Sequence, residues 1–263
     1  GSLTVGGAQV AGGDYNIGGT LTVDTDVLVN RNQIIEGSLL TYGDSLIKGD
    51  QIINGDLTID NNQLIKQDLT VNNDLVVNND LVVDKNQLIK QDLTINSNLL
   101  INNNLTVDNN QFIGKDLTVN SNLQVNYDLT VNNNQLIKRD LIINNDLLVN
   151  NDLVVDKNQL VKQDLIVNSN LVVNNDLVVD NNQLVKKDLT VNNDLLVNNN
   201  LVVDYNQLIK RDLTIYSNLI VNGNEIIDGD LKVNSDLIVD KNLYLEGTLR
   251  ASNLEVVGNS TVI

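Results

Sequence analysis

Residues 81–95 read LVVDKNQLIKQDLTI, in which triplets of mostly apolar residues alternate with triplets of polar residues. The same six-residue rhythm runs through the chain without an insertion, because every sixth residue from Val5 to Ile263 is apolar except Thr41. We label the positions of this hexad abcdef and place Val83 at position c. Position a is mostly Leu, position b is mostly Thr, Val, Leu or Ile, and positions d, e and f are mostly polar.

Each apolar triplet predicts a short β-strand. Residues two apart in a strand point to the same face, so the side chains at a and c would point inward and the side chain at b outward. The Asn and Asp residues that follow tolerate left-handed backbone geometry and hydrogen-bond their own backbone, so we expect them to form a bend. From Asp56 to Asn242, position f is always Asp or Asn. Short strands that keep turning the same way predict an all-β parallel β-helix, or β-solenoid, with equivalent strands stacked about 4.8 Å apart.

Helical and disordered alternatives fit the pattern poorly. Apolar residues at a, c and often b do not follow a 3.6-residue period, and Asn, Val, Thr and Asp are mediocre helix formers. Hydrophobic residues make up 41% of the chain. Their strict phase requires a buried core, which a disordered Asn-rich tract does not have.

A longer, 24-residue repeat of four hexads is superimposed on the hexads, with Gln in place of Leu at position a. Its members are Gln63, Gln87, Gln111, Gln135, Gln159, Gln183 and Gln207. A bulky residue follows at b, as at Leu88, Phe112 and Leu136, and Lys usually occupies d. Asp usually occupies d of the preceding hexad. We take these glutamines, with Leu88, Phe112 and Leu136, as candidate register or assembly residues.

Three windings can accommodate both repeats. A single chain with three hexads per coil would carry successive glutamines from face to face, and one with four hexads would stack them into a ladder. Three chains wound as an interwoven triangular prism would bring equivalent glutamines together on the axis. We favour this interwoven homotrimer, because an unpaired buried amide costs roughly 1–3 kcal/mol and a shared polar layer would fix register. The alternative, that the glutamines are tolerated near a corner, stays open.

The pattern predicts a single β-helical repeat domain over residues 1–263. Regular repeats cover 57–221, while the flanks 1–56 and 222–263 keep the phase and contain every Gly except Gly114. The outward position b is apolar in many hexads. Rows of such residues indicate lateral packing, although β-branched side chains also suit strands for their own sake.

The composition excludes several classes of function. A net charge of −17 disfavours nucleic acid and anionic membranes as partners. No apolar run is long enough to span a bilayer, so we expect no membrane insertion. The chain has no Cys, so it has no thiolate ligand for a metal. It also has no His, which is the commonest general base and the commonest metal ligand. We predict no enzyme, no cofactor and no metal site, since catalysis needs a unique cleft and the chain repeats itself. The lack of Met, even at position 1, indicates a fragment or a processed chain.

The flanks resemble a known class of fibre. The stretches GGTLTVDTDVLVN (18–30), NGDLTID (54–60) and NGNEIIDGDLKVNSDLIVDKNLYLEGTLRASNLEVVGNSTVI (222–263) are similar to shafts of phage and prophage tail fibres and related viral fibres. That resemblance implies a homotrimeric β-helical shaft, extracellular or on a virion. A weaker resemblance, to bactofilin-type β-helices, implies a cytoplasmic filament. The chain uses Asn where such shafts often use Gly, it has no recognisable receptor-binding tip, and neither resemblance supplies a site residue.

The sequence therefore predicts a non-enzymatic structural fibre or shaft, a rigid spacer or stalk of a viral or cell-surface appendage. The predicted partner is a further copy of the chain, in a trimer or in an end-to-end or lateral filament. The alternative function is a self-polymerising β-solenoid filament, cytoskeletal or extracellular. A surface that binds a ligand, ice or Ca²⁺ ranks third.

Overall fold

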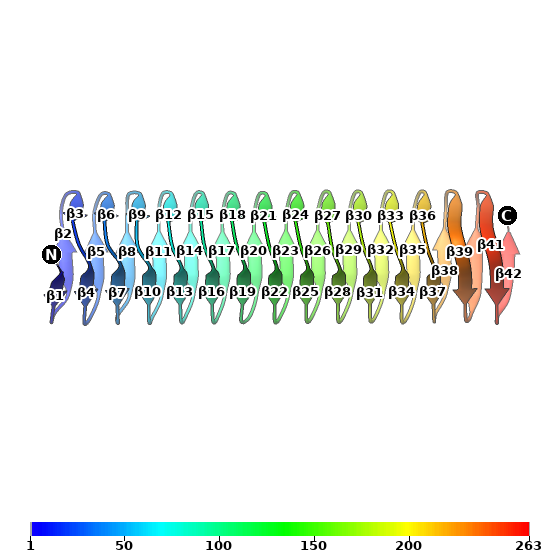
Figure 1. The fold of residues 1–263 in the computed structure, drawn as a ribbon, viewed down its shortest axis with the longest axis horizontal. Helices are drawn as coiled ribbons and strands as arrows, with labels where there is room; N and C mark the ends of the chain where they lie inside the picture. The colour runs from blue at the N-terminus through cyan, green and yellow to red at the C-terminus, as the bar shows by residue number, and fades with distance from the viewer. Residues whose placement is uncertain (1, 263) are drawn as a thin grey trace. The chain divides into compact units, whose positions relative to one another are not determined.

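The computed structural model describes residues 2–262, so Ile263 at the end of the apolar series lies outside the described residues. The described chain is all-β, with 42 strands and no helix. It divides into two compact units, residues 1–132 and 133–263. Each unit is a parallel β-solenoid built mainly from three-residue strands (Figure 1). The predicted all-β parallel β-helix is thus confirmed, while the assignment of one domain to residues 1–263 stays a prediction.

In unit 1, residues 1–132, the strands stack in three rows. The first row is β1 (Leu3–Val5), β4 (Leu21–Val23), β7 (Leu39–Thr41), β10 (Leu57–Ile59), β13 (Leu75–Val77), β16 (Leu93–Ile95), β19 (Gln111–Ile113) and β22 (Leu129–Val131). The second row is β2 (Gln9–Ala11), β5 (Val27–Val29), β8 (Ser45–Ile47), β11 (Gln63–Ile65), β14 (Leu81–Val83), β17 (Leu99–Ile101) and β20 (Leu117–Val119). The third row is β3 (Tyr15–Ile17), β6 (Gln33–Ile35), β9 (Gln51–Ile53), β12 (Leu69–Val71), β15 (Gln87–Ile89), β18 (Leu105–Val107) and β21 (Leu123–Val125).

Unit 2, residues 133–263, has the same organisation. Its first row is β23 (Gln135–Ile137), β26 (Leu153–Val155), β29 (Leu171–Val173), β32 (Leu189–Val191), β35 (Gln207–Ile209), β38 (Glu225–Ile227), β40 (Asn242–Leu245) and β42 (Asn259–Val262). Its second row is β24 (Leu141–Ile143), β27 (Gln159–Val161), β30 (Leu177–Val179), β33 (Leu195–Val197) and β36 (Leu213–Ile215). Its third row is β25 (Leu147–Val149), β28 (Leu165–Val167), β31 (Gln183–Val185), β34 (Leu201–Val203) and β37 (Leu219–Val221). The longer β39 (Leu231–Val239) runs through a corner and extends the second and third rows, and β41 (Leu249–Val256) pairs along it.

Strands within a row pair in parallel, and up to Ala251 each residue lies opposite its equivalent in the third hexad along the chain. From Asn253 onward the register is shifted by one residue, so that Asp236 lies opposite Asn253. Gln87, for example, lies between Leu69 and Leu105. A coil therefore contains three hexads of a single chain, which differs from the interwoven three-chain winding that we favoured from the sequence. The reason is geometric: three strands and three corners already return the chain to its starting row, so the coil closes without other chains. The number of copies that associate stays a prediction.

The predicted directions of the side chains are confirmed along most of the chain, but Val257 at position c is 66% exposed, because the register of the last coil is shifted by one residue. In strands such as β16 and β17, the residues at a and c are buried and the residue at b is half-buried. The core is therefore a stack of Leu at position a and Val or Ile at position c, nearly all of them at most 1% exposed. Burial of one such side chain stabilises the fold by roughly 1.5–3 kcal/mol, so the core is the main source of stability.

The corners differ from the prediction. No described residue has a positive φ, so the corners do not use left-handed geometry. The side chain at position f also bonds to the next coil rather than to its own backbone. Oδ1 of Asp74 accepts the backbone N–H of Asp92 at 3.1 Å, and Oδ1 of Asp92 accepts that of Asn110 at 3.1 Å. This ladder explains why position f is always Asp or Asn, because both place an acceptor oxygen at the same distance from the backbone.

Replacing one member of this ladder should measurably weaken the fold. Oδ1 of Asp80 accepts the backbone N–H of Asn98 at 3.0 Å and its Nδ2 at 3.2 Å. Asp80→Ala should therefore lower the free energy of unfolding by about 0.5–1.5 kcal/mol in urea titrations at neutral pH. Asp80→Asn keeps the acceptor oxygen and should cost less. Equal losses in the two variants would contradict the ladder.

The same pair of variants has a pH signature. The backbone hydrogen bond from Asn98, assisted by Ser97, lowers the pKa of Asp80 below its ordinary value. Its contribution to stability is therefore complete above the unfolded-state pKa of about 3.9 and is lost as the pH falls through the lower folded-state pKa. Asp80→Asn should lack this part of the acid-induced loss, which unfolding curves at pH 2–6 would measure.

Candidate functional site

The seven repeated glutamines all point into the core, and each is at most 2% exposed. The structure does not bring them together. Gln63 lies in the second row of unit 1, Gln87 in the third and Gln111 in the first. Successive glutamines are four hexads apart, and a coil contains three hexads. Each glutamine therefore lies one coil and one row beyond the glutamine before it. Their role as register residues stays a prediction.

The glutamine amides fall into two groups. Nε2 of Gln51 donates to Oε1 of Gln33 at 2.6 Å, and Nε2 of Gln63 donates to Oε1 of Gln51 at 2.6 Å. From Gln87 to Gln207, by contrast, neither amide atom of any repeated glutamine has a hydrogen-bond partner in the described chain. The difference follows from spacing, since a step of three or two hexads brings amides into contact, whereas a step of four leaves no second glutamine beside the first in its row. Gln87, for example, lies between Leu69 and Leu105, and Gln207 lies between Leu189 and Glu225.

Glu225 is the core residue that the sequence reasoning missed. It occupies position a of β38, between Gln207 and Leu243, and is fully buried. Neither carboxyl oxygen has a hydrogen-bond partner in the described chain. Burial raises the pKa of Glu225 well above its ordinary value, because desolvation penalises the charged form. The signal in the sequence was an acidic residue at position a, which is otherwise mostly Leu or Gln.

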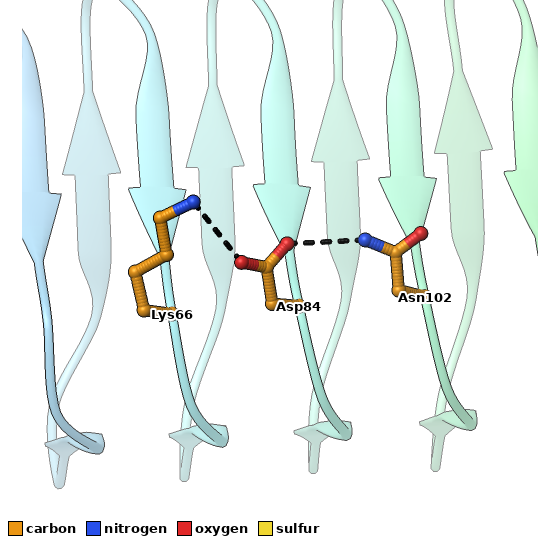
Figure 2. A network of polar contacts seen from close by, with 3 residues as sticks. All are labelled: Lys66, Asp84 and Asn102. Atoms are coloured by element: carbon orange, nitrogen blue, oxygen red, sulfur yellow. Dashed lines mark hydrogen bonds and ion pairs between the residues drawn. The ribbon is translucent and has the colours of Figure 1, made fainter.

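The outward candidates lie on the surface beside charged corners. Leu88 and Leu136 are half-buried, and Phe112 is 37% exposed. Position d carries a second ladder, which Figure 2 shows at Lys66, Asp84 and Asn102. Nζ of Lys66 lies 3.1 Å from Oδ2 of Asp84, and Nδ2 of Asn102 donates to Oδ1 of Asp84 at 3.0 Å. The exposed corner thus links neighbouring coils through side chains as well as through backbone bonds such as that from Asp84 N–H to the carbonyl of Ile65 at 2.9 Å.

The four-hexad repeat produces a regular charge order along such a corner. The order is Lys, Asp, Asn, Asn over four successive coils. In unit 1 it reads Lys66, Asp84, Asn102 and Asn120, and in unit 2 it reads Lys138, Asp156, Asn174 and Asn192, followed by Lys210 and Asp228. In this order each Lys is stacked next to an Asp. In the flank the order breaks down, because Lys48 is stacked next to Lys66.

Apolar rows cover the outward surface between the corners. Two of them are unbroken over six successive coils: Val10, Leu28, Leu46, Leu64, Val82 and Leu100 in unit 1, and Leu148, Ile166, Leu184, Val202, Ile220 and Ile238 in unit 2. An open groove runs beside the second of these, with Ile166, Leu184 and Val202 along one wall. A similar groove lies beside Ile142 and Leu160. The two grooves are built from the same hexad positions in different coils of unit 2.

Neither a metal-binding cluster in the described chain nor a known relative points to a function. Within residues 2–262, no group of three or more His, Cys, Asp or Glu side chains could hold a metal ion. That part of the chain also has no helix long and apolar enough to cross a membrane. The chain matches no family model, no curated protein and no solved structure. The resemblance to fibre shafts and bactofilins therefore stays a prediction.

The two groups of glutamines should respond in opposite ways to replacement by Leu. Gln87→Leu removes a buried amide without a protein partner and should raise the free energy of unfolding by about 1–3 kcal/mol. Gln51→Leu leaves the amides of Gln33 and Gln63 without their partner and should lower it. Urea unfolding of both variants measures the contrast. If Gln87→Leu instead gives broad, multistate unfolding, the glutamine fixes register rather than merely costing stability.

The carboxyl of Glu225 predicts a pH trend. Its folded-state pKa lies above the unfolded-state value of about 4.3, so the unfolded chain loses the proton first and stability falls as the pH rises above that value. Glu225→Gln should abolish this fall and raise the unfolding midpoint at neutral pH. Asp228→Asn, which removes an exposed carboxylate of the same hexad, should keep the wild-type trend. Thermal unfolding at pH 5 and pH 8 compares all three proteins, and parallel trends would refute a buried carboxyl.

Proposed function

We propose that the chain is a non-enzymatic structural fibre or shaft, serving as a rigid spacer or stalk of a viral or cell-surface appendage. The observation that carries this proposal is the uniformity of the coil. In both units nearly the same three strands and three corners recur in successive coils, with Leu at a and Val or Ile at c in most hexads. A solenoid unit whose cross-section hardly changes along its length is suited to spanning a distance.

The hydrogen bonds support a stiff element. Backbone bonds join each strand to the next coil, as from Leu75 N–H to the carbonyl of Asp92 at 3.0 Å. The side-chain ladders at positions d and f add bonds in the same direction at the corners. Bending would have to lengthen these bonds on one side of the solenoid, and each loses strength as it lengthens.

The surface also favours a structural role over catalysis. The grooves beside Leu184 and Leu160 have closely similar linings, since each is built from the same hexad positions of different coils. Catalysis depends on a few convergent polar groups at one place, which a repeated groove does not provide. The buried Glu225 faces the core and not a groove.

The second candidate function is a self-polymerising filament. The unbroken outward rows of Val, Leu and Ile favour it, because contiguous exposed apolar rows mark surfaces that associate. This candidate shares the solenoid with the first and differs in how copies associate.

Electron microscopy of the purified protein tests the proposal. A shaft should appear as rods of constant width whose length does not change with protein concentration. Rods that lengthen as the concentration rises would favour the filament instead. Compact particles without a constant width would contradict both functions.

A further inference from the structure

We infer that a second copy of the same chain docks on the outward apolar row of the third strand row in unit 2. We call this surface the Leu148 row; its residues are Leu148, Ile166, Leu184, Val202, Ile220 and Ile238. The inference deepens the proposed structural role by naming the partner of the shaft and the face it uses.

The Leu148 row is the most continuous apolar surface of unit 2. All six side chains are half-buried, and no polar residue interrupts them. The other two rows of the unit are broken, by Thr190 in the first and by Thr214 and Lys232 in the second. A contiguous apolar stripe on a polar protein is typical of an interaction surface rather than of a solvated one.

The shape of this face suits an occupant with the same repeat. One wall of the adjacent groove is the Leu148 row, and the other wall is the ladder of Asp164, Asn182 and Asn200. Both walls repeat once per coil, at the spacing of stacked strands, about 4.8 Å. A second copy offers outward side chains at this same spacing, so its row can fit along the whole groove. A partner without this repeat would fit at only one or two coils.

The two edges of the row differ in charge, because position f on one edge carries only Asp and Asn, whereas position d on the other carries one lysine among Asp and Asn. On the edge before the strands, Oδ1 of Asp164 accepts both N–H and Nδ2 of Asn182, at 3.0 and 3.2 Å, which leaves Oδ2 for a cation. On the edge after the strands, Lys186 is exposed. Asp204 lies one coil beyond Lys186 on that edge. An acidic edge and an edge with a lysine therefore border the same apolar row.

This arrangement selects the orientation of the second copy. A two-fold axis parallel to the strand rows places opposite edges together, so Lys186 of each copy lies opposite Asn182 of the other, one coil from its Asp164. The two copies then run parallel. The in-register pairing buries all six side chains of the row against their own counterparts, whereas every coil of slip leaves one side chain at each end uncovered.

Lysine substitutions on the row test the docking. In the full chain, Ile166→Lys with Leu184→Lys places two charges in the proposed contact, while Thr190→Lys with Thr214→Lys places two charges on the other rows as a control. Lysine at b is compatible with the fold, because Lys232 occupies that position. Light scattering should give about twice the 28.9 kDa chain mass for the wild type and the control. The row variant should raise the dimer dissociation constant at least about tenfold.

A wild-type protein that stays at 28.9 kDa at every concentration would overturn the inference. It would also be overturned if both double variants dissociated equally. Neither result would contradict the proposed structural role, because rods of constant width in micrographs of the monomer would still support a shaft. If micrographs showed no rods but light scattering showed the dimer, the shaft function would be contradicted and the docking of a second copy would still be supported.

The orientation is tested with single cysteines, since the chain has none of its own. Leu148→Cys and Ile238→Cys lie at opposite ends of the row. In a parallel, in-register pair each variant should form disulfide-linked dimers alone, and mixing the two should add no faster cross-link. Cross-linking only in the mixture would show antiparallel copies and overturn the parallel arrangement.

Discussion

The structure depends on one constraint, which is that each hexad hydrogen-bonds to the third hexad after it in the chain. The strands obey it through their parallel register, as between Leu75 and Leu93. The corners obey it through the side-chain ladders at positions d and f, as from Asn96 to Asn78. Up to Ala251 every position stacks on its own equivalent, so an inserted residue there would place position a over position b and turn the core side chains outward. The unbroken phase of the sequence is therefore a direct requirement of the coil.

The same constraint decides what the four-hexad repeat does. If Lys recurred in every third hexad, each would stack on another Lys about 5 Å away, and each pair would cost about 1 kcal/mol even in water. Because it recurs in every fourth hexad, Lys66 stacks on Asp84 and Asp84 on Asn102. The repeat thus places an Asp next to a Lys along the corners at successive levels, except where Gly114 and Asn132 stand in place of the Lys and the Asp. A chain with a net charge of −17 gains from lysines that are spread evenly in this way.

The sequence predicted what is local and failed where the partner of a residue is distant. The inward direction of Val83 and the outward direction of Leu88 follow from the two-residue period of a strand, so both could be predicted. The sequence could not predict which hexad stacks beneath them, because the pattern is the same whether that hexad belongs to this chain or to another copy. The corners were misjudged for a related reason. Asp92 bonds to the backbone N–H of Asn110 in the next coil, and local propensity, which favoured an Asx bend, carries no information about that contact. Glu225 was not predicted because it lies 18 residues after Gln207 and therefore outside the 24-residue series of glutamines.

The repeated glutamines are best understood together with their outer neighbours. Gln33, Gln51 and Gln63 show that core amides satisfy one another when they are three or two hexads apart. The later glutamines have a spacing that prevents this, so mutual hydrogen bonding is not what their repeat provides. The rest of the hexad recurs with each glutamine. Position b carries a bulky outward residue and position d usually carries an exposed Lys. Position d of the preceding hexad is usually Asp. A feature that weakens the core while repeating in step with the surface belongs to the surface pattern. The four-hexad period then distributes one such marked strand to each strand row every four coils.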